Sequence, residues 1–182
     1  MDVAWYFRLF YIPILSGILA GLLTFVIKPK RMTGPAISQH MKIVSMISFV
    51  GLVVWLWFVP FSINLAFWIG ICIIVFGHVV NSLAYIAMRE HPEKKKAVVD
   101  WGIYKVTRHP HFQHGVITTL GTIVMGWNTA SPIYLGLWGY LVLDIIFNHV
   151  AILQEEKGTT EKFGQEYVDY MKRVPRYFSI KQ

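Results

Sequence analysis

Long apolar runs are the feature that most constrains what this chain can fold into. A helix of about 20 apolar residues crosses the hydrocarbon core of a bilayer. Runs close to this length, mostly without the polar faces of a soluble amphipathic helix, cover residues 4–27, 43–59, 63–88, 114–127 and 132–153. Charged residues make up 15% of the chain, against about a quarter in soluble domains. We therefore predict an all-α, polytopic membrane protein with about five transmembrane helices.

The basic residues predict how these helices are oriented. Of the 17 Lys and Arg residues, all except Arg8 lie in segments 28–42, 89–110 and 157–181, whereas the connections near 60–62 and 128–131 carry no charge. The positive-inside rule then puts the N-terminus outside and the C-terminus in the cytoplasm. The net charge of +7 indicates contact with lipid headgroups rather than nucleic acid. Because no basic n-region precedes the first run, we expect it to be a retained helix, not a signal peptide.

The charged C-terminal tail has a different pattern. In EKFGQEYVDYMKRV the apolar side chains recur at helical spacing, at Phe163, Tyr167, Tyr170, Met171 and Val174. This stripe predicts a C-terminal amphipathic helix. Two placements are open: the helix lies on the membrane surface, or it packs back over the cytoplasmic end of the bundle.

The segment RHPHFQHG, residues 108–115, concentrates histidines at the cytoplasmic side. A metal site is one interpretation, but Pro110 splits the set and no cysteine or acidic pair stands at metal-ligand spacing within it. We therefore expect no metal. A membrane oxygenase would need several H-x-x-x-H boxes, and the chain has none. An interfacial cluster and a cofactor site remain open.

Polar residues inside the apolar runs suggest contacts with a substrate. Asp144 lies within a run, where an ionisable group is costly and usually functional, and Asn148 follows on the same helix face. His78 and Asn81 form a similar stripe in the third run. Hydrogen bonding between helices is the alternative explanation.

Two charged ends should meet at the cytoplasmic surface. Arg108 and His109 begin the fourth run, and Glu155 and Glu156 follow the fifth. Adjacent antiparallel helices would bring these ends together. A cation beside two carboxylates suits a zwitterionic, hydroxyl-rich ligand.

The same residues resemble the isoprenylcysteine carboxyl methyltransferases and phospholipid N-methyltransferases. The resemblance rests on GIYKVTRHPHF (102–112), a helical hairpin, the pair 155–156 and FGQEYVDYMKRVPRYF (163–178), and it covers residues 98–178 in order. Two positions depart from the family pattern. Phe112 replaces a tyrosine and so lacks its hydroxyl, and Thr159 stands where leucine is usual.

The resemblance implies a helical membrane enzyme that binds S-adenosylmethionine in a cytoplasmic pocket. Residues 1–182 would form a single domain, with N-terminal spans in residues 1–89 and the cofactor-binding half in residues 90–182. It implies cofactor-binding roles for Gly102, Tyr104, Arg108, His109, Pro110, Phe112, His114, Glu155 and Glu156, with catalytic roles for Arg108, His109 and Glu156. The methyl acceptor would be lipophilic: a prenylcysteine carboxylate, a phospholipid amine or a small thiol. Asp144, Asn148, His78 and Asn81 are candidate acceptor contacts.

Two other functions compete with this one. Membrane sterol reductases also carry an Arg-His-Pro segment, but this chain has His111 where they have asparagine and lacks a glutamate after Gly115. A non-enzymatic membrane scaffold that retains the fold is the second alternative.

Overall fold

The chain is all-helical throughout the part that the computed structural model describes, residues 8–29, 39–89, 98–128 and 131–178. This confirms the all-α part of the predicted fold class. The structure has five long helices, a short 3₁₀ helix η1 and a C-terminal helix. They are α1 (Tyr11–Ile27), α2 (Gln39–Trp57), α3 (Leu65–Ala87), η1 (Gly102–Lys105), α4 (Pro110–Met125), α5 (Pro132–Phe163) and α6 (Gln165–Arg173).

The long helices follow the apolar runs, but their ends differ from prediction. The predicted start at Ala4 lies outside the described residues, and α1 begins at Tyr11. Just before it, the Leu9 backbone N–H donates to the Val59 carbonyl at 3.0 Å. α5 is 32 residues long and continues to Phe163, well past the predicted end of its span. Gly164, with φ of 60°, then separates α5 from α6.

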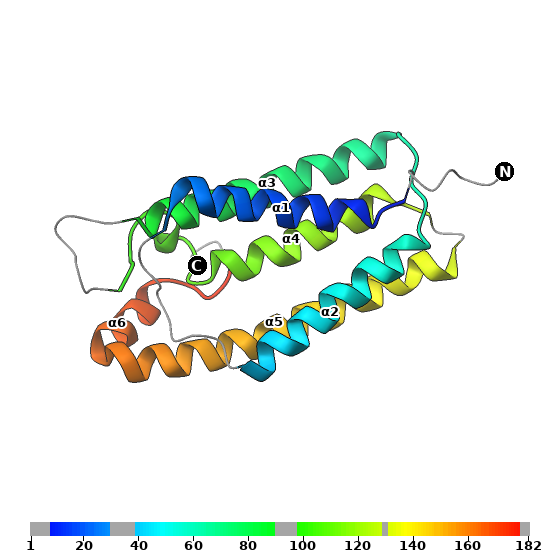
Figure 1. Cartoon of the computed structure of the whole chain (residues 1–182). Coiled ribbons are helices and arrows are strands. Elements are labelled where there is room, and N and C mark those ends of the chain that lie inside the picture. The colour runs from blue at the N-terminus through cyan, green and yellow to red at the C-terminus, as the bar shows by residue number, and fades with distance from the viewer. Residues whose placement is uncertain (1–7, 30–38, 90–97, 129–130, 179–182) are drawn as a thin grey trace.

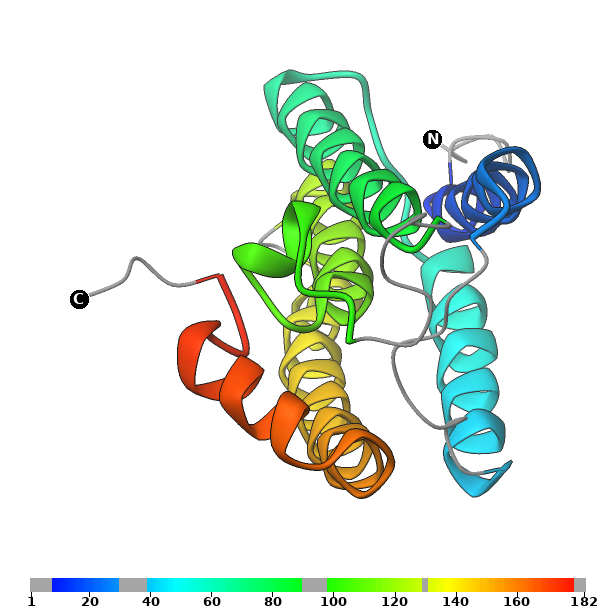
Figure 2. The same cartoon turned by 90° about the vertical axis from the view of Figure 1, so that its left-hand side faces the viewer.

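The closest helix pair is α3 and α4. A Cβ atom added at Gly70 would lie 2.5 Å from the Gly121 carbonyl oxygen, so only glycine permits this approach. α2 lies beside α5 (Figures 1 and 2), where Trp55 Nε1 donates to the Ile133 carbonyl at 3.0 Å. A buried apolar cluster that includes Leu56, Ile123 and Leu137 joins these helices.

The two ends of the bundle differ in what they carry. Residues 98–109, η1 and α6 gather at one end, and the turns between α2 and α3 and between α4 and α5 lie at the other (Figure 1). The segments that flank the basic loops are therefore on one side of the bundle, together with the charged half of α5.

The outward surface of the helices is apolar. Phe25 is 74% exposed, Leu65 75% and Leu143 67%, and large apolar surfaces mark contact with lipid or a partner. Among the described residues, α3 and α5 are long and apolar enough to cross a membrane, and α1 and residues 43–57 of α2 are shorter apolar helices. The chain is accordingly a helical membrane protein.

Candidate active site

A tight loop before α4 places the first two site residues. Gly102 has φ of +61°, a conformation that L side chains rarely adopt, and it lies against Ala87 as η1 begins. η1 buries Tyr104 against Ala84 and Met88. The chain then enters α4 with His109 at the N-cap and Pro110 in the first turn, where proline is favoured.

The Glu156 carboxylate on α5 lies at the centre of the site. Arg108 Nη2 is 3.1 Å from Glu156 Oε1, and His109 Nε2 donates to the same oxygen at 3.0 Å. Arg176 donates to Glu156 Oε2 from Nη2 at 2.6 Å and from Nε at 3.1 Å. The other ring nitrogen of His109, Nδ1, is 3.5 Å from Glu155 Oε2. We call Arg108, His109, Glu155, Glu156 and Arg176 the Glu156 cluster.

Arg176 is a site residue that the sequence interpretation did not assign. The C-terminal segment reaches the cluster because it pairs with the loop before α4. The Arg108 N–H donates to the Pro175 carbonyl at 3.1 Å, and the Thr107 hydroxyl donates to the Arg176 carbonyl at 3.0 Å. The signal was present in the Val-Pro-Arg triplet of residues 174–176, which was part of the family pattern but carried no role.

Helix α6 covers the cluster from the side. Tyr167, Tyr170 and Val174 are buried and pack with Val98, and the Tyr170 hydroxyl donates to the Tyr104 carbonyl at 2.8 Å. The apolar side of α6 thus packs against the chain itself.

Thr159, the unusual residue of α5, also faces this region. It is 2% exposed, and its hydroxyl donates to the Glu155 carbonyl at 2.7 Å. The buried hydroxyl is therefore satisfied within the helix. Between α6, η1 and α5 there remains a cavity of about 10 Å³, room for roughly one water. It is lined by Val98, Val99, Tyr104, Arg108, His109, Glu155, Thr159, Tyr167 and Tyr170.

The contacts within the cluster favour the charged forms of Glu156 and His109. Burial acts to raise the pKa of the Glu156 carboxyl, but hydrogen bonds from His109 and Arg176 and the charge of Arg108 outweigh it and lower the pKa to about 2. Burial likewise acts to lower the pKa of His109, and its hydrogen bonds to Glu155 and Glu156 raise that pKa above 6.5. Both ring nitrogens of His109 face carboxylates, which suits the protonated imidazole.

The tyrosines of α6 stay neutral. Burial raises the pKa of both Tyr167 and Tyr170 far above the ordinary value of 10. These two tyrosines therefore add no charge to the site.

The histidines of RHPHFQHG separate in the structure. Phe112 lies near His109, with ring centroids 6.0 Å apart, whereas His111 bonds Asn81 on α3 at 2.7 Å. His114 lies deeper, with its ring 4.8 Å from that of His78. Among the described residues, no group of three or more His, Cys, Asp or Glu could hold a metal ion.

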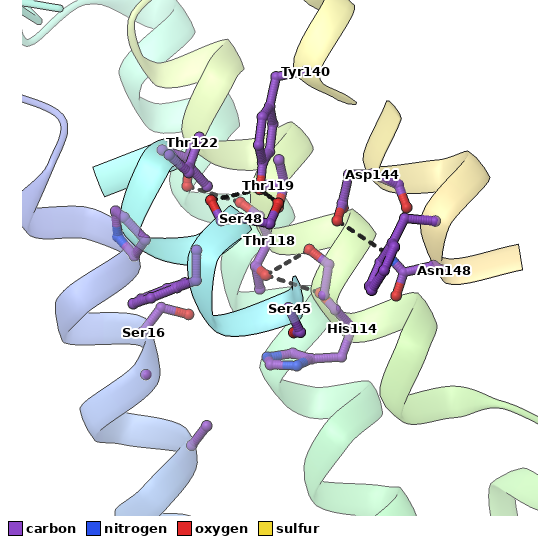
Figure 3. Close-up of a pocket in the computed structure, with 17 residues that line it drawn as sticks. Ser16, Ser45, Ser48, His114, Thr118, Thr119, Thr122, Tyr140, Asp144 and Asn148 are labelled. Atoms are coloured by element: carbon purple, nitrogen blue, oxygen red, sulfur yellow. Dashed lines mark hydrogen bonds between the residues drawn. The ribbon is translucent and has the colours of Figure 1, made fainter. Parts of the chain in front are cut away.

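A second, larger cavity between α1, α2, α4 and α5 (Figure 3) brings together some of the remaining predicted contacts. Asp144, Asn148 and His114 line it. His78 stands beside it, since its Nε2 is 2.9 Å from the hydroxyl of Ser16, another lining residue. Asn81 is not among the lining residues.

Comparisons with known proteins agree with the family resemblance. A family model described as "Protein of unknown function (DUF1295)" matches residues 7–174. "Protein-S-isoprenylcysteine O-methyltransferase B" of Arabidopsis thaliana is 28% identical over 150 residues, 76% of this chain and 73% of that protein. The probable protein-S-isoprenylcysteine O-methyltransferase of Oryza sativa subsp. indica is 27% identical over 128 residues, 65% of this chain and 60% of that protein. The Xenopus laevis protein-S-isoprenylcysteine O-methyltransferase is 27% identical over 115 residues, 59% and 38% of the two chains.

The chain therefore belongs to the DUF1295 family. These curated relatives are named protein-S-isoprenylcysteine O-methyltransferases. The chain spans less than two thirds of the length of several of these relatives. No solved structure matches the chain significantly.

Proposed function

We propose that this protein is a multi-pass membrane enzyme that transfers a methyl group from S-adenosylmethionine to a lipophilic acceptor. The observation that carries the proposal is the Glu156 cluster. It joins the Arg-His pair, the Glu-Glu pair and the C-terminal arginine, three segments of the family pattern that are far apart in the chain, at one buried position.

The charges of the cluster fit the cofactor. Its methionine end carries a carboxylate and an ammonium, and its ribose carries hydroxyls. Arg108 and Arg176 suit the carboxylate, since the guanidinium fork matches carboxylate geometry. Among the described residues the Glu155 carboxylate contacts His109 at 3.5 Å, which leaves it acceptor capacity for ammonium or ribose donors.

The remaining predicted positions support these charged residues. Gly102 turns the loop, and Pro110 starts α4. Tyr104 lines the small cavity, Phe112 lies near His109, and His114 lines the larger cavity. The enclosed space of about 10 Å³ is far smaller than the cofactor, so binding requires α6 and the C-terminal segment to move away from η1.

When bound, S-adenosylmethionine would supply an activated methyl group on a sulfonium sulfur, and the acceptor would take up that methyl group as the neutral thioether leaves. The protein then needs mainly to position the two reactants and exclude water. A carboxylate acceptor requires no general base, whereas an amine must first lose a proton. The buried, already ionised groups of the Glu156 cluster suit binding and orientation better than proton transfer.

The leading acceptor is the carboxylate of a lipid-modified cysteine, because the curated relatives are named for that substrate. A phospholipid amine and a small lipophilic thiol are the other acceptor classes. In each case the acceptor would enter from the bilayer, through the apolar surface between the helices.

The topology completes the proposal. α1 to α5 would form five transmembrane helices within a single domain, with residues 1–89 as N-terminal spans and 90–182 as the cofactor-binding half. α6 would be a C-terminal amphipathic helix at the cytoplasmic surface, because the described residues that flank the basic segments lie at the same end of the bundle as the Glu156 cluster (Figure 1).

Titration calorimetry of the full chain in detergent, with S-adenosylmethionine against NADPH, tests the proposal. We expect binding of S-adenosylmethionine alone, and Glu155→Gln should weaken it at least tenfold. Glu161→Gln is the matched control, because Glu161 is exposed on the same helix. Binding of NADPH alone would indicate a reductase, and binding of neither ligand would indicate a scaffold; both outcomes overturn the proposal.

A further inference from the structure

The larger cavity lies between the apolar helices, and its lining residues include none of the Glu156 cluster. It has a volume of about 270 Å³ and is walled by α1, α2, α4 and α5. Its lining residue Asn148 and the cluster residue Glu155 are on the same helix, separated by roughly 10 Å at 1.5 Å per residue. Because residues seven apart share a helix face, a molecule that extended along this face of α5 from the cluster would reach the cavity.

The cavity wall is unusually polar for its position. Ser48 from α2 and Tyr140 from α5 contact each other through their hydroxyls at 3.1 Å, and Asn148 donates to Asp144 Oδ1 at 3.0 Å. Figure 3 shows these side chains and His114 coming from different helices toward the shared space. His114 Nε2 is buried and has no hydrogen-bond partner among the described residues.

The acid in this wall determines which occupant fits. The lining residues include Asp144 but neither lysine nor arginine. A carboxylate has about four acceptor positions, and the bond from the Asn148 side chain uses one. A purely hydrocarbon chain offers no donor to Asp144 or partner to His114, and an unpaired polar group facing hydrocarbon is costly.

A hydroxyl group satisfies this wall in either protonation state of Asp144. It donates to a carboxylate and accepts from a carboxylic acid, and it can pair with either tautomer of the His114 ring. A second carboxylate would instead meet Asp144 with no cation in the wall to neutralise it.

We propose that the cavity binds the far end of the methyl acceptor and that this end carries a hydroxyl group, so that the substrate is a hydroxylated lipophilic chain rather than a plain prenyl group. The inference rests on the proposed function for identifying the occupant as the acceptor. The reacting group stays near the Glu156 cluster, and the hydroxyl meets Asp144 about 16 Å further along α5. Ser45 and Phe49 of α2 are exposed parts of the wall, which gives the chain a lateral route from the lipid.

The test compares two acceptor probes with the full chain in lipid nanodiscs: N-acetyl-S-farnesylcysteine and its analogue with a hydroxyl on the terminal prenyl carbon. Binding is measured by thermal shift, and transfer by labelled S-adenosylmethionine. We expect the hydroxylated probe to bind at least about tenfold more tightly, because it pairs a group that the other probe leaves unpaired. Asp144→Leu should abolish this preference and Asp144→Asn should reduce it, whereas Leu143→Ala, on the lipid-facing side of the same helix, should retain it.

Equal affinity of the two probes for the wild-type chain would overturn the inference, as would a preference that persists in both Asp144 variants. Because thermal shift needs no turnover, the two proposals fail separately. Equal KM values for both probes with active transfer would refute the hydroxyl site and keep the methyltransferase proposal. An Asp144-dependent preference without transfer to either probe would refute the methyltransferase proposal and keep the ligand class of the cavity.

Discussion

Replacing Glu156 by glutamine tests whether this carboxylate holds the cytoplasmic end of the bundle together. The side chain of Glu156 is 8% exposed and that of Arg108 is 9% exposed. Glutamine keeps the shape and one acceptor oxygen but removes the negative charge. Arg108, Arg176 and His109 would then share their positions without the central counter-charge.

Two independent arguments give the magnitude. The pKa of Glu156 is lowered from 4.5 to about 2, which corresponds to roughly 3 kcal/mol at about 1.4 kcal/mol per pKa unit. Removal of one partner from a buried ion pair typically costs about 3–5 kcal/mol. The lower end applies because Arg176 is 31% exposed and can regain water. We therefore expect Glu156→Gln to lower the free energy of unfolding by about 3 kcal/mol.

Thermal unfolding in detergent measures this loss. For a chain of this size about 1 kcal/mol shifts the midpoint by roughly 2–4 °C, so the variant should unfold roughly 6–12 °C earlier at pH 7. Glu155→Gln is the matched control and should cost less than half as much, since Glu155 makes one long contact with His109. Equal losses in the two variants would refute the central role of Glu156.

The pH dependence provides a second check on the same residue. A carboxyl whose pKa is lowered by folding stabilises the protein above its unfolded pKa, near 4.5, and this contribution is lost as the pH falls toward about 2. The wild-type midpoint should therefore drop more steeply below pH 4.5 than that of Glu156→Gln. Parallel curves would show that the carboxylate does not carry this stability.

Three further changes test other parts of the structure. Folding raises the pKa of His109, so the stability that its charge provides is present below about pH 6.5 and is lost as the pH rises through the folded value. The unfolding midpoints of the wild type and of His109→Gln should therefore converge at alkaline pH. A constant difference between the two midpoints would contradict this. Gly70→Ala should lower the free energy of unfolding by about 1–3 kcal/mol, because its Cβ would lie 2.5 Å from the Gly121 carbonyl oxygen. Gly51→Ala is the control, since its Cβ would have nothing within 4 Å. Equal denaturation midpoints of the two variants would argue against the close α3–α4 contact. Asn64→Ala removes the side chain that accepts a hydrogen bond from the Phe67 N–H at the start of α3, and it should lower the free energy of unfolding by about 1 kcal/mol. Asn64→Ser should keep most of that stability. Equal losses of stability in both variants would rule out the cap.

Hydropathy predicted the helices well because each long helix presents apolar side chains outward. It located their ends less well. α5 continues to Phe163 because its charged half still packs against η1 and α6, a tertiary contact that no local pattern reveals. The 3₁₀ turn at Gly102 depends on the positive φ of that residue, and a lone glycine in a polar loop has many other uses.

The part of the site that Arg108–His109 and Glu155–Glu156 form was predictable, because each pair of polar residues stands out at the end of an apolar run. Arg108–His109 and Glu155–Glu156 were expected to meet because antiparallel helices bring their ends together, and the structure places them in contact. Their roles in binding and catalysis stay a prediction. Arg176 was missed because its position depends on two hydrogen bonds, from the Arg108 N–H to the Pro175 carbonyl and from the Thr107 hydroxyl to the Arg176 carbonyl, and these leave no periodic signal. The separation of His109 from His114 likewise depends on side-chain direction in α4 rather than on spacing alone.

The acidic residues of α5 have different surroundings because they lie at different positions along the helix. Its apolar part, residues 132–153, spans roughly 33 Å at 1.5 Å per residue, slightly more than the hydrocarbon core of about 30 Å. Glu155 and Glu156 follow just beyond that length, where water and basic residues can compensate their charge, and Glu156 is in fact paired with three basic side chains. Asp144 lies roughly 13 Å below residue 153, where the lining of its cavity includes no cation. The same helix therefore places one acid where basic side chains of the protein compensate its charge. It places the other in a cavity whose described lining contains no lysine or arginine, where we propose that a ligand hydroxyl pairs with it.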